Sequence, residues 1–142
     1  MRKETLRVTT LGLFIMVAIA SGYGQSLDPM HVKVPFQFTA AGETLPAGDY
    51  AIKALSASGK VAMIRNEDTS QAVLVLTNPA ISAPSKNSRV VFHRYGNQYF
   101  LSSIWIAGDR TGSEVIKSRA ERELEKGVSN RQMLSLVIYA NR

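Results

Sequence analysis

Two strand-like runs joined by a two-residue turn constrain the fold of this chain more than any other feature. Residues 89–95 and 98–106 are rich in β-branched and aromatic side chains, and only Gly96 and Asn97 separate them. This arrangement predicts a β-hairpin, because a two-residue turn between antiparallel strands needs positive φ, where glycine costs least. We therefore expect the chain to be organised around an antiparallel sheet.

The turn also sets which residues face each other across the predicted hairpin. With two residues in the turn, Arg94 faces Tyr99 and His93 faces Phe100, and side chains then alternate between the two faces. One face carries Val90, Phe92, Arg94, Tyr99, Leu101, Ser103 and Trp105, and the other carries Val91, His93, Tyr95, Phe100, Ser102, Ile104 and Ile106. Both faces mix apolar and polar side chains, so neither is predicted as the solvent-facing one.

Six further segments have the patterns of strands. They are residues 32–38, 50–55, 60–65, 72–76, 114–117 and 133–139. The first alternates with a period of two, but Pro35 lacks a backbone donor and predicts a sheet edge or a bulge. Residues 72–76 are apolar on both faces and predict a central strand covered on both sides, and 133–139 have the same two-sided pattern. Residues 78–88, with two prolines, predict the longest loop.

One short helix is predicted near the C-terminal end. Ser118 and Glu121 have the spacing of a capping box, in which the hydroxyl meets the Glu121 amide and the Glu121 carboxylate reaches back. Gly127 is placed to end the helix after about two turns. Because its apolar content is little more than Ala120 and Leu124, we expect it to pack on the sheet along a narrow stripe.

Eight short strands and one helix predict a mainly all-β fold. The chain has 142 residues, which suits a single core, and too few helices for parallel crossovers. The prediction is one antiparallel β-sandwich or a small β-barrel over residues 31–142, with the sandwich preferred.

Residues 1–20 have the layout of a cleaved secretory signal. Three basic residues precede the apolar stretch 8–20, and Ala18 and Ala20 match a small-x-small cleavage site. Cleavage after Gly24 is the alternative. A helix needs about 20 apolar residues to span the hydrocarbon core, so we interpret this segment as a signal and expect no stable membrane anchor afterwards. Residues 21–30 are an extended lead, and the mature chain is expected in the periplasm or outside the cell.

Composition excludes several classes of function. The chain has no Cys, which excludes disulfides, cysteine-ligated metals and thiol nucleophiles. Without residues 1–20 the net charge is +4, so nucleic acid is not expected as a partner. Residues 86–142 hold 10 basic and 5 acidic side chains, and this half would favour an anionic surface if it is more than a solvated face.

Several short sequence segments along the mature chain resemble those of a known family. They are residues 34–38, 45–50, 73–78, 92–101 and 118–124. Together they resemble small exported proteins of unassigned function predicted in acidobacterial genomes. The resemblance covers nearly the whole mature chain and is most specific in residues 92–101. It implies an extracytoplasmic β-domain, and it brings no catalytic or binding residue with it.

The residues that could carry metal or acid–base chemistry do not form strong motifs. His31 and His93 are the only histidines and lie far apart in sequence, so no metal site and no cofactor are predicted. His93 could meet Ser102 only as a near-diagonal hairpin neighbour, and no Gly-x-Ser-x-Gly elbow is present. The carboxylate pairs Asp109 with Glu114 and Glu67 with Asp68 lie in or beside turns, where acids are common. We therefore predict no catalytic residue.

Aromatic side chains on the hairpin are the remaining candidates for binding. Arg94, Tyr95, Tyr99 and Trp105 are the predicted binding residues, since an exposed ring offers a large apolar area at low rotamer cost. Trp105 is nevertheless expected to be buried, because an aromatic ring at strand spacing usually belongs to the core. Arg94 and Tyr99 are expected to form a cation–π contact across the strands.

These observations predict a non-catalytic exported β-domain that acts by interaction with a protein or a glycan. The alternative is a small barrel that binds a hydrophobic ligand, which requires a cavity of about 300 Å³ or more. A hydrogen-bonded Ser, His93 and carboxylate in one cleft would instead favour catalysis. The sequence gives no indication of the oligomeric state.

Overall fold

The computed structural model describes residues 28–56, 58–128 and 133–141. The predicted signal, residues 1–20, and the first part of the lead lie outside the described residues. The described strands are β1 (Met30–Val34), β2 (Phe38–Ala40), β3 (Glu43–Leu45), β4 (Gly48–Ala54), β5 (Val61–Asn66), β6 (Ala72–Ile81), β7 (Arg89–Tyr95), β8 (Gln98–Trp105), β9 (Thr111–Val115) and β10 (Met133–Tyr139). The helix α2 (Arg119–Gly127) lies between β9 and β10. The mainly all-β prediction is confirmed.

The described part of the chain holds ten strands where eight were predicted. The predicted strand 32–38 is interrupted at Pro35, so that β1 ends at Val34 and β2 begins at Phe38. The other additional strand, β3, pairs with β2 through a tight turn in which Ala41 and Gly42 have positive φ. Short strands of three residues give too little alternation to be recognised in the sequence.

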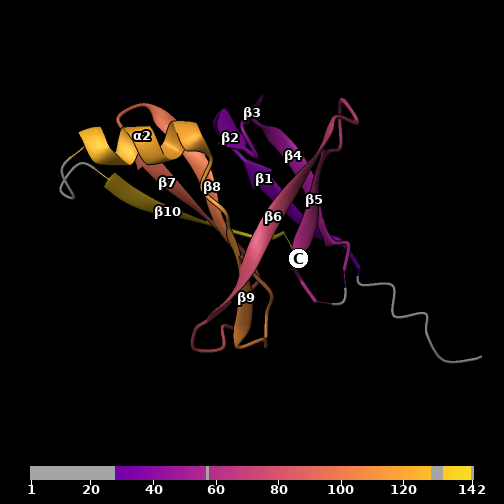
Figure 1. Cartoon of the computed structure of the whole chain (residues 1–142). Helices are drawn as coiled ribbons and strands as arrows, with labels where there is room; N and C mark the ends of the chain where they lie inside the picture. The colour runs from indigo at the N-terminus through magenta and orange to yellow at the C-terminus, as the bar shows by residue number, and fades with distance from the viewer. Residues whose placement is uncertain (1–27, 57, 129–132, 142) are drawn as a thin grey trace, which may run out of the picture.

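The strands form one folded, open sheet. Strands β1, β4, β5 and β6 pair antiparallel in that order, and β6 continues into β9, β8, β7 and β10. Strand β2 joins β8 in parallel through Thr39 and Phe100, so the prediction of a purely antiparallel sheet is wrong at this one pairing. Figure 1 shows β4 and β5 on one side, β7, β8 and α2 on the other, and β6 passing between them.

Strand β6 is longer than predicted and is covered on one face only. The prediction of a loop from residue 78 is wrong, because the strand continues through Pro79 to Ile81 and pairs with β9. The hydrogen bond from the Ser82 amide to the Arg110 carbonyl fixes the register of β6 against β9. In this register the Pro79 nitrogen points away from β9, so its missing hydrogen costs no bond between the two strands. The prediction of cover on both sides is also wrong, since Leu74 and Leu76 are 57% and 61% exposed.

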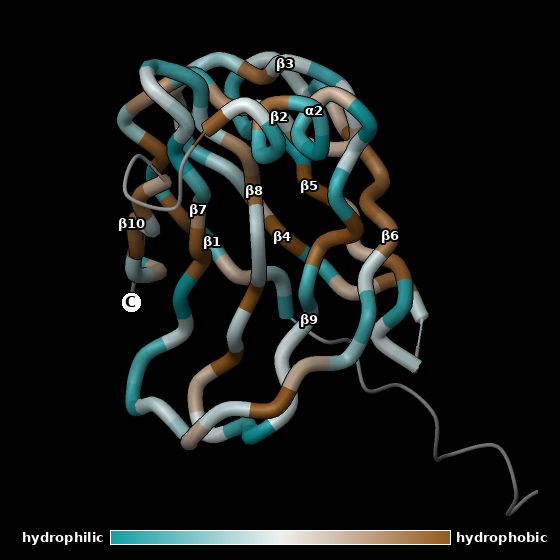
Figure 2. The backbone as a smooth tube through the Cα atoms, turned by 60° about the vertical axis from the view of Figure 1, so that its left-hand side comes forward, coloured by the Kyte–Doolittle hydropathy of each residue, from teal (hydrophilic) through white to brown (hydrophobic). Residues whose placement is uncertain are grey.

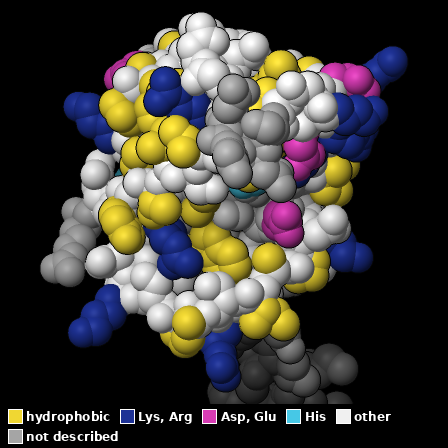
Figure 3. Space-filling model, turned by 90° about the vertical axis from the view of Figure 1, so that its left-hand side faces the viewer, with side chains coloured by type: hydrophobic (Ala, Val, Ile, Leu, Met, Phe, Trp, Pro, Cys, Tyr) yellow, Lys and Arg dark blue, Asp and Glu magenta, His cyan; other side chains and the backbone are white. Residues whose placement is uncertain are grey.

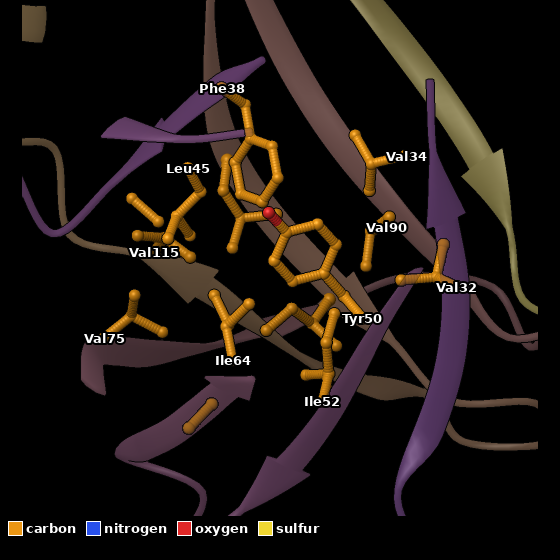
Figure 4. Packing of buried hydrophobic residues seen from close by; sticks show 14 of the residues in the cluster. Val32, Val34, Phe38, Leu45, Tyr50, Ile52, Ile64, Val75, Val90 and Val115 are labelled. Carbon is orange, nitrogen blue, oxygen red and sulfur yellow. The ribbon is translucent and has the colours of Figure 1, made fainter. Parts of the chain in front are cut away.

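The core lies between the two halves of the folded sheet. The largest fully buried side chains include Tyr50, Phe92, Leu45, Ile64 and Val32. In Figure 4 the Tyr50 ring points toward Phe38, and its hydroxyl donates to the Pro46 carbonyl. Buried side chains alternate with more exposed ones along β1, β4, β5 and β6, so each of these strands turns one side to the core. Figure 2 shows brown, hydrophobic residues along β5 and β6.

The hairpin β7–β8 is confirmed with its turn, and it contains a bulge that the sequence does not reveal. Arg94 faces Tyr99 as predicted, and Gly96 has a φ of 62°. The register shifts at Val91, which leaves Ser102 as an extra residue in β8. Beyond this bulge Val90 faces Ile104, so the prediction that these two lie on opposite faces is wrong, and both belong to the core.

The helix and the last strand differ from prediction in what they bury. Ser118 accepts the Glu121 amide as predicted, at 3.2 Å, but the buried side chain of α2 is Glu121, whereas Ala120 is exposed. Strand β10 pairs with β7 only, and several of its apolar side chains are exposed, so cover on both sides is wrong here as well.

Replacing Gly112 by Ala tests the contact between β9 and β8. A Cβ at this position would lie 2.3 Å from Cε3 of Trp105, so the ring or the strand must move. We expect Gly112→Ala to lower the free energy of unfolding by about 2 kcal/mol, the usual scale of overpacking. Urea denaturation measures this. Gly127→Ala is the control, since a Cβ there meets nothing within 4 Å, and equal effects of the two changes would contradict the packing described.

Candidate functional site

Arg94 and Tyr99 meet near the turn of the hairpin, as predicted. The Arg94 guanidinium carbon lies 5.6 Å from the centre of the Tyr99 ring, which confirms the cation–π contact. The Arg94 Nε also donates to the Gly96 carbonyl at 2.6 Å. The Tyr99 ring also stacks on Phe36, with centroids 4.0 Å apart and planes at 17°. Both side chains are therefore held in place before any partner arrives.

The structure places the other two predicted binding residues differently. Tyr95 is 3% exposed, and its ring is covered rather than offered to solvent. Trp105 lies at the opposite end of the hairpin, half-buried, where it faces Arg89 and donates from Nε1 to the Ser103 hydroxyl at 2.9 Å. The Arg89 guanidinium carbon lies 5.2 Å from the centre of its ring. The four residues therefore do not form a single site.

A groove lies at the tip of the hairpin and extends onto α2 and β10. It has a volume of about 620 Å³ and is open to solvent. Its lining comes from the turn, the helix and the last strand, namely Arg94, Tyr95, Gly96, Asn97, Gln98, Leu124, Val128 and Leu134. Figure 3 views the side of the molecule that carries α2 and β10, where hydrophobic side chains lie between Lys and Arg. Sequence reasoning found Arg94 and Tyr95 but missed the apolar wall, which comes from segments distant in sequence.

A second, more enclosed cavity lies at the far end of the folded sheet. Its volume is about 340 Å³. Apolar walls come from Ile52, Ala54, Pro79 and Ile106, while hydroxyl groups and two carboxylates, Asp28 and Asp109, contribute the polar part. This cavity has the size that the ligand-binding alternative requires.

Beneath α2, four polar side chains form a cluster in which Glu121 and Tyr95 are buried and His93 and Ser102 are half-buried. Glu121 is 3% exposed, and its Oε1 accepts a hydrogen bond from the Tyr95 hydroxyl at 3.1 Å. The same oxygen lies 3.5 Å from His93 Nδ1, and His93 Nε2 lies 3.0 Å from the Ser102 hydroxyl. Ser102 lies two residues beyond Phe100, which faces His93, so the two side chains meet as the near-diagonal neighbours predicted from the sequence. The helix thus docks on the sheet through a carboxylate.

The cluster unites an acid, an imidazole and a hydroxyl, but its geometry fits docking better than catalysis. His93 Nδ1 is buried and forms no hydrogen bond, and the Glu121 oxygen nearest to it is already bonded to Tyr95. A catalytic triad needs the acid hydrogen-bonded to the imidazole and room for a substrate beside the hydroxyl. Neither of the two cavities described above is lined by His93 or Ser102.

Electrostatics at the cluster follow from burial. Burial raises the pKa of the Tyr95 hydroxyl strongly, and the negative charge of Glu121 raises it further. At the surface of α2, a hydrogen bond from Lys117 lowers the pKa of the Glu125 carboxyl, with Nζ 2.6 Å from Oε1. The bond to Tyr95 joins α2 to the sheet, and the bond from Lys117 joins the helix to the segment that precedes it.

The remaining candidate residues stay apart. His31 Nδ1 lies 2.8 Å from Glu67 Oε1 on the surface, whereas the neighbours of the His93 ring are Ser102 and Glu121. Among the described residues, no three His, Asp or Glu side chains gather closely enough to hold a metal ion. No helix in the described ranges is long and apolar enough to cross a membrane.

Comparisons with protein-family models, with curated proteins and with solved structures found no match to the chain. The function is therefore inferred from the geometry of the site and from the sequence.

Removing the Tyr95 hydroxyl tests the anchoring of α2. We expect Tyr95→Phe to lower the free energy of unfolding by about 1–2 kcal/mol at neutral pH, because buried Oε1 of Glu121 loses its donor. Because the pKa of Tyr95 is raised in the folded protein, its hydroxyl loses its proton less readily there than in the unfolded chain. The free energy of unfolding is therefore highest below pH 10.0, the ordinary tyrosine value, and falls as the pH rises above it. The variant should therefore lose less stability than the wild type above pH 10.0.

Chemical denaturation across neutral and alkaline pH measures both effects. Tyr99→Phe is the matched control, since Tyr99 lies on the hairpin without this burial and is expected to behave like the wild type. If Tyr95→Phe were as stable as this control at every pH, the anchoring role would be wrong.

The Ser102 hydroxyl is expected to be unreactive. A fluorophosphonate probe, which labels activated serines, should modify the wild type no more than Ser102→Ala, because Ser102 lines neither of the two cavities described above and His93 Nδ1 has no hydrogen bond to an orienting acid. Mass spectrometry of the intact protein measures the labelling. Stoichiometric labelling that both Ser102→Ala and His93→Gln abolish would identify a nucleophile and overturn this interpretation.

Proposed function

We propose that this chain is an exported β-domain without catalytic activity, which binds a protein partner at the cell envelope or outside the cell. The groove at the hairpin tip carries the proposal, because it combines a fixed guanidinium, turn amides and an apolar wall in one open depression. A surface of this kind suits an extended protein segment, with apolar anchors in the hollow and polar contacts around it.

The chemistry of the groove favours a partner segment with acidic and apolar residues. Arg94 supplies a guanidinium that can hold a carboxylate through two parallel hydrogen bonds. Leu124 and Leu134 supply the apolar surface on the opposite wall. The excess of basic side chains in residues 86–142 would also attract an acidic partner over longer distances.

The rigidity of the groove supports binding at low entropic cost. The hydrogen bond to Gly96 and the contact with Tyr99 restrict Arg94, and Phe36 in turn holds Tyr99. A side chain that is already ordered loses little freedom when the partner binds.

Export is the second part of the proposal, and the sequence supports it. Basic residues, an apolar stretch and a small-x-small site in residues 1–20 form the pattern of a cleaved signal. The absence of Cys is compatible with an oxidising compartment, where free thiols are reactive. The resemblance to exported proteins agrees with this location.

Within the same proposal, the folded sheet is an open β-sandwich whose two halves enclose the core.

The alternative function, binding of a hydrophobic small ligand, is favoured by one observation, the cavity of about 340 Å³ at the far end of the sheet. Its polar lining would restrict the ligand to one that also carries hydroxyl or cationic groups.

The proposal predicts that peptides with acidic and apolar residues bind at the hairpin tip. Arg94→Ala should weaken the best binders from a peptide library about tenfold or more, since a hydrogen bond between charged groups contributes about 1.5–3 kcal/mol. Isothermal titration calorimetry measures the dissociation constants. Arg110→Ala, at an exposed arginine outside the groove, should leave them unchanged.

A glycan array and a panel of amphipathic small molecules form the parallel arms of this experiment. Binding of glycans alone would replace the protein partner by a sugar. Peptide binding that Arg94→Ala leaves intact, with an unchanged melting temperature, would place the binding surface elsewhere.

A further inference from the structure

The core-facing side of β6 continues beyond the end of the core. Val73, Val75 and Thr77 are buried in alternation along this strand. Pro79 and Ile81 follow on the same side, because side chains two residues apart share a face, yet both are exposed, and Ile81 is 87% exposed. At this end of the folded sheet, β6 therefore carries an inner apolar face that no described strand covers.

The far-end cavity of about 340 Å³ lies on this inner face, between the two halves of the folded sheet. On one half, Ser113 of β9 pairs with Pro79, and both line the cavity. On the other half, Ile52 belongs to the core and also lines the cavity. Ser113 Oγ lies 4.0 Å from the point that a Cβ on Gly59 would occupy, so the two halves approach each other closely here. This end lies at the bottom of Figure 1, where β9 is labelled. The cavity is thus a continuation of the core.

The charged side chains at this cavity are acidic. Among the described residues that line it, Asp28 and Asp109 are the charged ones, and both are exposed, which places them at the rim. Lys60 and Arg110 are sequence neighbours of lining residues, but neither lines the cavity. No described ion pair involves Asp28 or Asp109. The rim is therefore complementary to a cation.

The other lining groups indicate which kind of cation fits. Hydroxyl groups of Ser56, Ser58, Thr111 and Ser113 line the cavity beside the carboxylates. All of these oxygens can accept hydrogen bonds, and a primary ammonium has three N–H donors to offer. A quaternary ammonium has none and binds best against aromatic rings, whereas no aromatic side chain of the described chain lines this cavity. The lining therefore favours a primary ammonium.

We propose that the far-end cavity binds a small primary amine that carries an apolar chain. The ammonium lies at the rim beside Asp28 and Asp109. The apolar chain extends over Pro79 and Ile106 toward Ile52, where it continues the core. At ~30 Å³ for each water-sized group, the volume suits a ligand of about ten non-hydrogen atoms. This inference rests on the ligand-binding alternative above and is independent of the groove at the hairpin tip.

Titration with octylamine tests the class of ligand. The matched probes are 1-octanol, which is neutral, and octanoate, which is anionic, and both have the same number of carbon atoms. At neutral pH octylamine should bind about tenfold or more tightly than either probe, because its charge complements the rim. Two-dimensional NMR measures the dissociation constants, and the amides of Gly59, Ile106 and Ser113 should shift most.

Removing one carboxylate tests the position of the ammonium. Asp109→Asn should weaken the binding of octylamine about tenfold and leave that of 1-octanol unchanged, since it removes charge but keeps the shape. Asp109 is exposed beside a turn, so the variant should fold as the wild type does. Glu114→Gln is the matched control, because Glu114 is an exposed carboxylate of β9 that does not line the cavity.

Filling the cavity tests the site of the apolar chain. Ala54 lines the cavity from the core-facing side of β4, so Ala54→Leu should abolish the binding of octylamine without lowering the melting temperature. Ala51→Leu, on the opposite side of the same strand, should bind octylamine as the wild type does.

Equal affinity for octylamine and 1-octanol would overturn the proposed primary amine and would leave the cavity as a site for a neutral hydrophobic ligand. Failure of all three probes to bind, or octylamine binding that Ala54→Leu leaves intact, would overturn the cavity as a ligand site as well. Peptide binding at Arg94 is measured separately, so neither result bears on the groove.

Discussion

The burial of the hairpin β7–β8 on both faces is the constraint on which the rest of the structure depends. On one face Phe92 and Leu101 join the core between the halves of the sheet. On the other face Tyr95 and Phe100 are covered, and the carboxylate of Glu121 holds α2 above them through the Tyr95 hydroxyl. The hairpin thus connects the core, the helix and β10, and each candidate surface is positioned relative to it.

The buried carboxylate explains why the helix lies where it does. A buried charged group is costly unless it is hydrogen-bonded, so only a placement of α2 that brings Glu121 to Tyr95 satisfies it. An apolar contact alone would allow the short helix to slide, because hydrophobic burial has little directionality. The position of Glu121 also sets that of Leu124, three residues on, which forms part of the groove wall. Stability beneath α2 and the shape of the groove are therefore coupled.

Much of the local structure could be predicted from the sequence, because it depends on short-range rules. The turn at Gly96, the pairing of Arg94 with Tyr99 and the cap at Ser118 all follow from a few neighbouring residues. The bulge at Ser102 could not be predicted, since both faces of the hairpin mix apolar and polar side chains and an extra residue leaves no break in the pattern. The continuation of β6 through Pro79 depends on which edge of the strand is paired, and this is a property of the whole sheet.

The candidate site shows the same division between local and tertiary information. The side chain of Glu121 was expected to cap its own helix, but the tertiary contact with Tyr95 competes with that bond and prevails. Trp105 and Tyr99 are both hairpin aromatics, yet a ring packed against Gly112 and a ring stacked on Phe36 cannot be distinguished by strand periodicity. The apolar wall of the groove joins residues from α2 and β10, which no local motif connects.

Residue-resolved hydrogen exchange measures whether the doubly covered hairpin is the most rigid part of the fold. We expect the hydrogen-bonded amides of β7 and β8 to exchange more slowly than all others, at the rate of global unfolding. Amides of α2 should become exchangeable in a smaller opening that leaves the hairpin protected. Exchange of the β7 and β8 amides through local opening, faster than that of β4 and β5, would contradict it.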